Sequence, residues 1–317
     1  MDRRAFIAAA AGLALAPRAL AAAGSRRVAL VTADLEHRLV VVDLAGGRVL
    51  RHVPTVDQPR SIETVGGFAV VAHSELGAIT VVRASPLRAV HVLEGFGEPR
   101  YTAAHPDGRH AYVTDAKRGE LICLDVIRGR VLSRTQVGEL ARHVSIDPAG
   151  RRLWVALGAK AELISVVDVS RRDRPRLVRQ LKPPFLAHDV GFAPDGRRVW
   201  VSSGDQNVLA LYDRRSGRVL AQPAADLPPQ HITFRGELAF VTSGDSGTLR
   251  VHDRAGRPLR TVAVPKGSYN VQQRAGRVVT PGLGNGSLCI LDGRGRLLRR
   301  LQVARSSHDA CIVETAA

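Results

Sequence analysis

The chain has 317 residues, and 45% of them are hydrophobic, which is enough to build a sizeable core. Its formal net charge is +17, and such an excess can indicate nucleic acid, an anionic membrane surface or small anions as partners. Almost all of the basic residues are arginines scattered through predicted turns, with no run of five and no interleaved aromatic residues. A nucleic-acid partner is therefore not expected.

Residues 1–23 have the features of an export signal. Arg3 and Arg4 precede an apolar stretch that ends near Ala16, too short for the about 20 residues that span a bilayer. Small residues at Ala21–Ala23 offer a cleavage site, and no cysteine follows for a lipid anchor. The segment resembles a twin-arginine signal peptide, which implies export of the folded chain to the periplasm or the outside of the cell. An uncleaved N-terminal anchor stays open as the alternative.

A short strand that ends in Val-Thr or a similar pair recurs seven times after this segment. Its copies are Leu30–Ala33, Val70–His73, Tyr112–Asp115, Trp154–Leu157, Trp200–Ser203, Phe240–Ser243 and Val278–Pro281. A second strand follows about ten residues later and usually closes on aspartate. The closing residues recur about every 39 to 45 positions, the interval of four-stranded propeller blades: Asp43, Arg83, Asp125, Asp168, Asp213, Asp253 and Asp292.

The turns between these strands support an all-β fold. Pro106-Asp107-Gly108 and Pro194-Asp195-Gly196 are tight-turn sequences, because proline presets φ and glycine accepts a positive φ. Short strands of β-branched and aliphatic residues between such turns form a four-stranded antiparallel meander that cannot bury both faces alone. Seven meanders arranged radially bury them, so residues 24–317 are predicted to form one seven-bladed β-propeller.

The sequence also predicts how the ring closes. The repeat begins near Val28 with a strand of the second type, and no innermost strand precedes it. Residues 307–313 match the innermost strands of the other repeats. The C-terminal strand is therefore expected to complete the first blade and to leave no open sheet edge.

Tyr112-Val113-Thr114-Asp115 differs by one residue from the strand that names the YVTN-type β-propellers, and residues 28–317 resemble that family. The resemblance implies the architecture more than a function, since the family includes lactonase-like proteins and surface-layer modules. The three cysteines, Cys123, Cys289 and Cys311, have no disulfide or zinc spacing, and Cys123 falls in an apolar column of the repeat.

The first residues of the seven innermost strands are expected to surround one mouth of the central channel. They are polar or aromatic in every repeat, and four of the eleven histidines gather there. The predicted ligand-binding residues are Arg60, Arg100, Tyr101, Arg142, His143, His188, Asp189, His231, Tyr269, Asn270, His308 and Asp309.

Three interpretations of this mouth stay open. It can be a water-filled channel end whose polar groups satisfy one another. It can be an anion site, because Arg60, Arg100 and Arg142 come from consecutive repeats and arginine binds carboxylate or phosphate bidentately. It can hold a divalent metal ion, the one cofactor considered, because imidazole and carboxylate groups suit Zn²⁺, Cu²⁺ or Fe²⁺. The candidate metal ligands are His188, His231, His308 and Asp309.

The favoured function is an exported, monomeric, non-catalytic propeller that binds a small anionic molecule or an exported partner protein at this mouth. The alternatives are a lactonase-like hydrolase or a metal or redox accessory protein that uses the same residues. No catalytic residue can be named, since the sequence has no Gly-x-Ser-x-Gly elbow, no phosphate-binding Gly-rich loop with lysine and no His-Glu-x-x-His motif.

Overall fold

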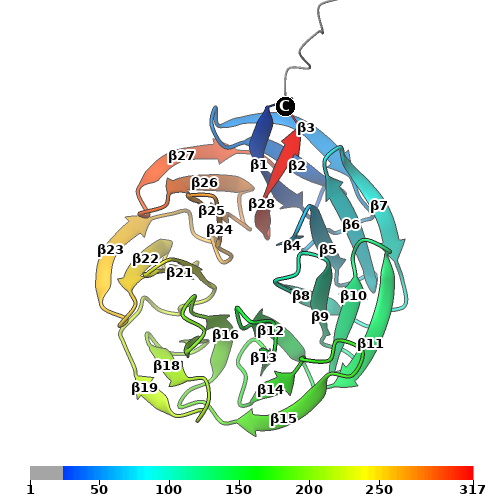
Figure 1. The fold of residues 1–317 in the computed structure, drawn as a ribbon. Coiled ribbons are helices and arrows are strands. Elements are labelled where there is room, and N and C mark those ends of the chain that lie inside the picture. The colour runs from blue at the N-terminus through cyan, green and yellow to red at the C-terminus, as the bar shows by residue number, and fades with distance from the viewer. Residues whose placement is uncertain (1–23, 317) are drawn as a thin grey trace, which may run out of the picture.

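The computed structural model describes residues 24–316, and over that range the chain forms 28 strands in seven four-stranded sheets around a central channel (Figure 1). The predicted all-β propeller is confirmed. The expected signal segment, residues 1–23, lies outside the described residues. Within residues 24–316 no helix has the length and apolar character needed to cross a membrane.

Each blade is an antiparallel sheet, and the strands occupy four concentric positions. The innermost strands of blades one to seven are β28 (Ala310–Ala316), β4 (Ser61–Val65), β8 (Pro99–Ala104), β12 (Ala141–Ile146), β16 (Ala187–Phe192), β20 (Ile232–Arg235) and β24 (Gln272–Arg274). The second strands are β1 (Ser25–Ala33), β5 (Phe68–His73), β9 (His110–Asp115), β13 (Arg152–Leu157), β17 (Arg198–Ser203), β21 (Leu238–Ser243) and β25 (Arg277–Pro281).

The outer half of each blade carries the closing residue, an aspartate in all blades but the second, and the exposed edge. The third strands are β2 (Arg38–Asp43), β6 (Ala78–Ala84), β10 (Glu120–Asp125), β14 (Ile164–Asp168), β18 (Leu209–Asp213), β22 (Thr248–Asp253) and β26 (Ser287–Asp292). The outermost strands are β3 (Arg48–Pro54), β7 (Leu87–Leu93), β11 (Arg130–Gln136), β15 (Arg176–Leu181), β19 (Val219–Ala221), β23 (Pro258–Ala263) and β27 (Leu297–Gln302).

The predicted closure of the ring is confirmed. Strand β28 pairs antiparallel with β1, with Val313 opposite Val28 and Ala310 opposite Val31 (Figure 1). Val313 then packs into the apolar layer between blades one and two, where it meets Ile62. Closure therefore pairs the inner edge of β1 and also fills part of the core between blades.

Apolar layers between neighbouring blades form the core. Trp154 of blade four and Tyr212 of blade five are fully buried, with an edge-to-face contact at 5.4 Å between ring centroids. The three cysteines are free and buried in these layers, and burial raises the pKa of the Cys123 thiol to about 12. The thiols therefore serve as apolar packing groups.

Candidate functional site

Irregular strand starts place the predicted mouth residues around the channel. In β8, β12 and β16 the pairing with the second strand shifts register across two residues each: Arg100-Tyr101, Arg142-His143 and His188-Asp189. A β-bulge of this kind re-aims side chains at the rim of a closed β-structure. Polar groups at the same level of three consecutive blades thus meet at one mouth.

Hydroxyl groups of the second strands hold two of these bulges, those of β8 and β16. The Ser202 hydroxyl accepts a hydrogen bond from the Asp189 N–H at 2.9 Å and donates one to the Gln230 carbonyl of the next blade at 2.6 Å. Thr114 accepts from the Tyr101 N–H at 3.2 Å and donates to the Arg142 carbonyl at 2.6 Å. A hydroxyl near the end of the second strand thus ties blade three to blade four and blade five to blade six.

Tyr101 and three histidines form one cluster at the centre of the mouth. The ring centroid of Tyr101 lies 4.3 Å from that of His143 and 5.2 Å from that of His231. His143 in turn lies 4.4 Å from His188 and 4.8 Å from His231. His308 stands at the edge of the cluster, 6.5 Å from Tyr101. The sequence register thus brings all four predicted histidines together.

The imidazoles of this cluster are neutral at physiological pH. Burial lowers the pKa of His143, His231 and His308 well below the ordinary value, and nearby positive groups lower it further. Burial lowers the pKa of His188 to about 4, although the Ala159 carbonyl opposes the shift. Neutral rings offer lone pairs to a metal ion or to a hydrogen-bond donor.

The three predicted arginines lie beside the cluster, each from its own blade. Arg100 bonds to Glu98 at 2.8 Å, and the guanidinium of Arg142 lies 5.9 Å from the ring centroid of Tyr101. Among residues 24–316, neither Arg60 nor Arg142 has an ion-pair partner, and the Arg142 Nε is buried without a hydrogen bond. Burial lowers the pKa of Arg142, and the charges of Arg100 and Arg60 lower it further. Positive charge at this mouth is therefore poorly compensated.

The two predicted carboxyl groups are used by the scaffold. Asp189 accepts the N–H groups of Val190 and, in the next blade, of Ile232 at 2.8 and 2.9 Å. Asp309 makes the equivalent bonds to Ala310 and Ile62 at 2.8 and 3.0 Å. Burial raises the pKa of Asp189 to about 7 and that of Asp309 well above the ordinary value.

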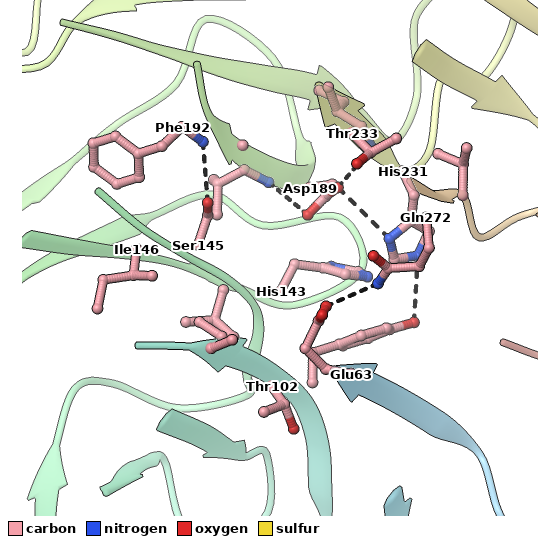
Figure 2. A pocket seen from close by; sticks show the side chains of 18 of the residues that line it. Glu63, Thr102, His143, Ser145, Ile146, Asp189, Phe192, His231, Thr233 and Gln272 are labelled. Carbon is pink, nitrogen blue, oxygen red and sulfur yellow. Dashed lines mark hydrogen bonds and ion pairs between the residues drawn. The ribbon is translucent and has the colours of Figure 1, made fainter. Parts of the chain in front are cut away.

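A cavity of about 330 Å³ opens inside the channel beneath Tyr101, His143 and His231. Figure 2 shows Asp189 and His231 above it and the Glu63–Gln272 pair beside it. Gln272 donates to Glu63 at 2.9 Å across the channel, and burial raises the pKa of Glu63 to about 7. This pair was not among the predicted site residues, although an acidic residue inside the apolar strand β4 is a signal that could have found it.

Two other predicted residues have different surroundings. The Tyr269 hydroxyl donates to Asp245 at 2.9 Å, and its ring lies against Gly244 in the loop beside the mouth. Asn270 is buried, and its amide donates to the His308 carbonyl at 2.7 Å.

Of the expected metal ligands, His188 and His231 fall in a group whose ligand atoms lie within 4.8 Å of one another, and the third member is His143. His308 and Asp309 lie outside that group.

No protein-family model and no curated protein matches the sequence. Three solved structures are similar in fold. A chain of hydrazine synthase from Kuenenia stuttgartiensis is 18% identical with a TM-score of 0.66, over 80% of this chain and 89% of that one. A functionally unknown protein from Desulfotomaculum acetoxidans is 12% identical with a TM-score of 0.78, over 91% and 99%.

The third is the dihydro-heme d1 dehydrogenase NirN in complex with DHE. It is 17% identical with a TM-score of 0.62, and the match covers 87% of this chain and 63% of NirN. The chain thus spans less than two thirds of the NirN chain. Likeness at these identities establishes the propeller fold and leaves the function to the site itself.

Proposed function

We propose that this chain is an exported β-propeller that binds a small anionic ligand at the channel mouth. The observation that carries the proposal is the convergence of Arg60, Arg100 and Arg142 from three consecutive blades. Of these three arginines, only Arg100 has a carboxylate partner among the described residues. A partly buried charge without a partner is costly, and an anion would offset that cost.

The surrounding groups indicate the chemical class of the ligand. Guanidinium groups hold carboxylate and phosphate oxygens through paired hydrogen bonds. Tyr101 and the neutral imidazoles supply a polar, partly aromatic floor without a negative charge of their own. We therefore infer a ligand with at least two acidic groups, such as a dicarboxylate or a phosphorylated small molecule. Because NirN was solved in complex with DHE, a haem-type tetrapyrrole carboxylate belongs among the probes.

Export is the second part of the proposal. Arg3 and Arg4, the short apolar stretch and the small residues that end it support targeting by the twin-arginine route. Residues 24–317 would then act as one mature domain in the periplasm or outside the cell.

Calorimetric titration of residues 24–317 with phosphate, succinate, citrate and haemin tests the binding proposal. We expect a 1:1 complex with at least one of them, and Arg142→Ala should weaken it at least about tenfold, since a hydrogen bond to a charged group contributes about 1.5–3 kcal/mol. Arg294→Ala is the matched control, because this exposed arginine lies in the turn before β27, at the opposite face. Equal weakening by both substitutions, or no binding at millimolar concentrations, would contradict the proposal.

A further inference from the structure

Three imidazoles of the cluster are arranged like a metal-ligand set. They come from blades four, five and six, and their candidate ligand atoms all lie within 4.8 Å of one another. His143 lies centrally between the other two, because its ring centroid is 4.4 Å from His188 while the centroids of His188 and His231 are 5.6 Å apart.

A hydrogen bond to the backbone orients one of these rings, and a second ring has longer polar contacts. His188 Nδ1 lies 2.8 Å from the Ala159 carbonyl, so this nitrogen carries the proton and Nε2 is left with its lone pair. His231 Nδ1 lies 3.6 Å from the Asp189 carboxyl group, and its Nε2 lies 3.4 Å from the Tyr101 hydroxyl. A carbonyl behind the distal nitrogen, as at His188, is a usual arrangement around a metal-binding histidine, because it fixes the tautomer and the ring orientation.

The buried ring of His143 supports a metal site independently of the distances between the three rings. The residue is 1% exposed, and both of its ring nitrogens are buried without a hydrogen-bond partner among the described residues. Buried side-chain nitrogens nearly always have a partner, so an orphaned imidazole at the centre of a polar cluster needs an explanation. A metal ion would satisfy one of these two nitrogens.

We propose that His143, His188 and His231 bind one late transition-metal dication, of the Zn²⁺ or Cu²⁺ class, directly beside the arginines of the mouth. Three neutral nitrogen donors favour these ions over Mg²⁺ or Ca²⁺, which prefer oxygen. Metal–nitrogen bonds of about 2.0–2.1 Å place tetrahedral ligand atoms about 3.3 Å apart, so the ligand atoms would need to approach one another by at most about 1.5 Å on binding. His308 and Asp309 take no part in this site.

The charge of the mouth makes metal and anion interdependent. A dication would lie close to Arg142, which precedes His143 in the chain and whose guanidinium lies 5.9 Å from the ring centroid of Tyr101. An anion that bridges the metal and the arginines removes this repulsion and fills the fourth coordination position that three protein ligands leave open. This coupling, unlike the metal site, rests on the proposed anion binding. It requires that each ligand tighten the other by the same factor.

Metal binding is measured first, without anion. Untagged residues 24–317 are stripped with EDTA, exchanged into a non-coordinating buffer and titrated with Co²⁺, whose visible absorption reports coordination geometry, followed by displacement with Zn²⁺. We expect one equivalent with a tetrahedral or five-coordinate spectrum, and at least a hundredfold loss of affinity in His143→Ala and in His188→Ala. His308→Ala is the control in the same mouth and should retain the spectrum. No one-to-one complex, or equal loss in His308→Ala, would overturn the site.

Anomalous diffraction and phosphate titrations test the metal site and its coupling to the anion separately. If His143→Ala unfolds, anomalous diffraction at the zinc edge from the wild-type protein should show one peak within bonding distance of all three rings, and a peak elsewhere refutes the assignment. Phosphate titrations are then compared between metal-loaded and EDTA-treated protein, with at least tenfold tighter binding expected when metal is present. Equal phosphate affinities with metal bound would overturn the coupling alone, whereas phosphate binding without any metal binding would overturn the metal site alone.

Discussion

The hydroxyl of Thr114 in blade three donates a hydrogen bond of 2.6 Å to the backbone carbonyl of Arg142 in blade four. The same oxygen accepts from the N–H of Tyr101. One side chain of the repeat thus sets the backbone position of an arginine and of the tyrosine over which that arginine lies. Thr114 therefore links the packing of two blades to the position of the proposed binding residues.

Thr114→Val should disturb both. Valine keeps the shape but removes the hydroxyl, which leaves buried backbone groups without a partner and should lower the free energy of unfolding by about 1–3 kcal/mol. Anion binding should weaken as well, because Arg142 loses its anchor. Thr135→Val, in the outermost strand β11, is the control. Urea unfolding measures the change in stability, and calorimetry measures the change in anion affinity. An unchanged anion affinity would show that Thr114 stabilises the fold without positioning the proposed binding residues.

Removal of residues 310–317 should open the ring. Strand β28 covers the edge of β1 and contributes Cys311 and Val313 to the core between blades one and two. We expect a loss of several kcal/mol, comparable with the whole stability of about 5–15 kcal/mol of a typical domain. A chain shortened by its last two residues keeps the buried part of β28 and serves as the control. Equal melting temperatures for the two truncations would show that closure does not depend on β28.

The architecture could be predicted because its signals are local and repeated. Short strand ends such as Val-Thr recur in all seven repeats, most repeats close on aspartate, and three have proline–glycine turns, so the spacing of these signals gives the number of blades. The register of the repeat also placed His143, His188, His231 and His308 at one mouth.

The directions in which individual side chains of the mouth point could not be predicted from the sequence. Tyr269 occupies an equivalent position in the repeat but bonds to Asp245 in a loop, which depends on the space left beside Gly244. Glu63 and Gln272 meet across the channel from positions 209 residues apart, a pairing that no local pattern specifies. His143, in the bulge of β12, belongs to the group of three imidazoles whose ligand atoms lie within 4.8 Å of one another, whereas His308 lies outside it.

Glu63 should make stability depend on pH. Burial raises its pKa in the folded protein from the ordinary 4.5 to about 7, so between these values the folded state holds a proton that the unfolded state has released. The contribution of Glu63 therefore makes the protein less stable as pH rises from about 4.5 to about 7, and this loss is complete above pH 7. Glu63→Gln should remove it, so the stability of the variant relative to the wild type should rise with pH over that range.

The expected gain is at most about 3 kcal/mol, from 1.36 kcal/mol per pKa unit, and water in the channel cavity will reduce it. Urea unfolding at pH 5 and pH 7.5 measures the change, with Glu94→Gln at an exposed position as the control. A difference between Glu63→Gln and the wild type that stays constant with pH would show that Glu63 is ionised in the folded protein.

Export should depend on the paired arginines. Replacing Arg3 and Arg4 together by lysine keeps the charge of the segment but removes the twin-arginine pattern. The precursor should then remain in the cytoplasm, which cell fractionation and immunoblotting detect. Normal export of the double variant by the same route would refute the assignment of residues 1–23.

A crystal structure of residues 24–317 with the tightest-binding probe at saturating concentration would show whether the mouth bordered by Arg60 and Arg142 binds an anion. We expect one bound anion within hydrogen-bond distance of both guanidinium groups, on the side of Tyr101 that faces the mouth. A mouth that contains water alone at saturation, or an anion bound only elsewhere on the propeller, would contradict it.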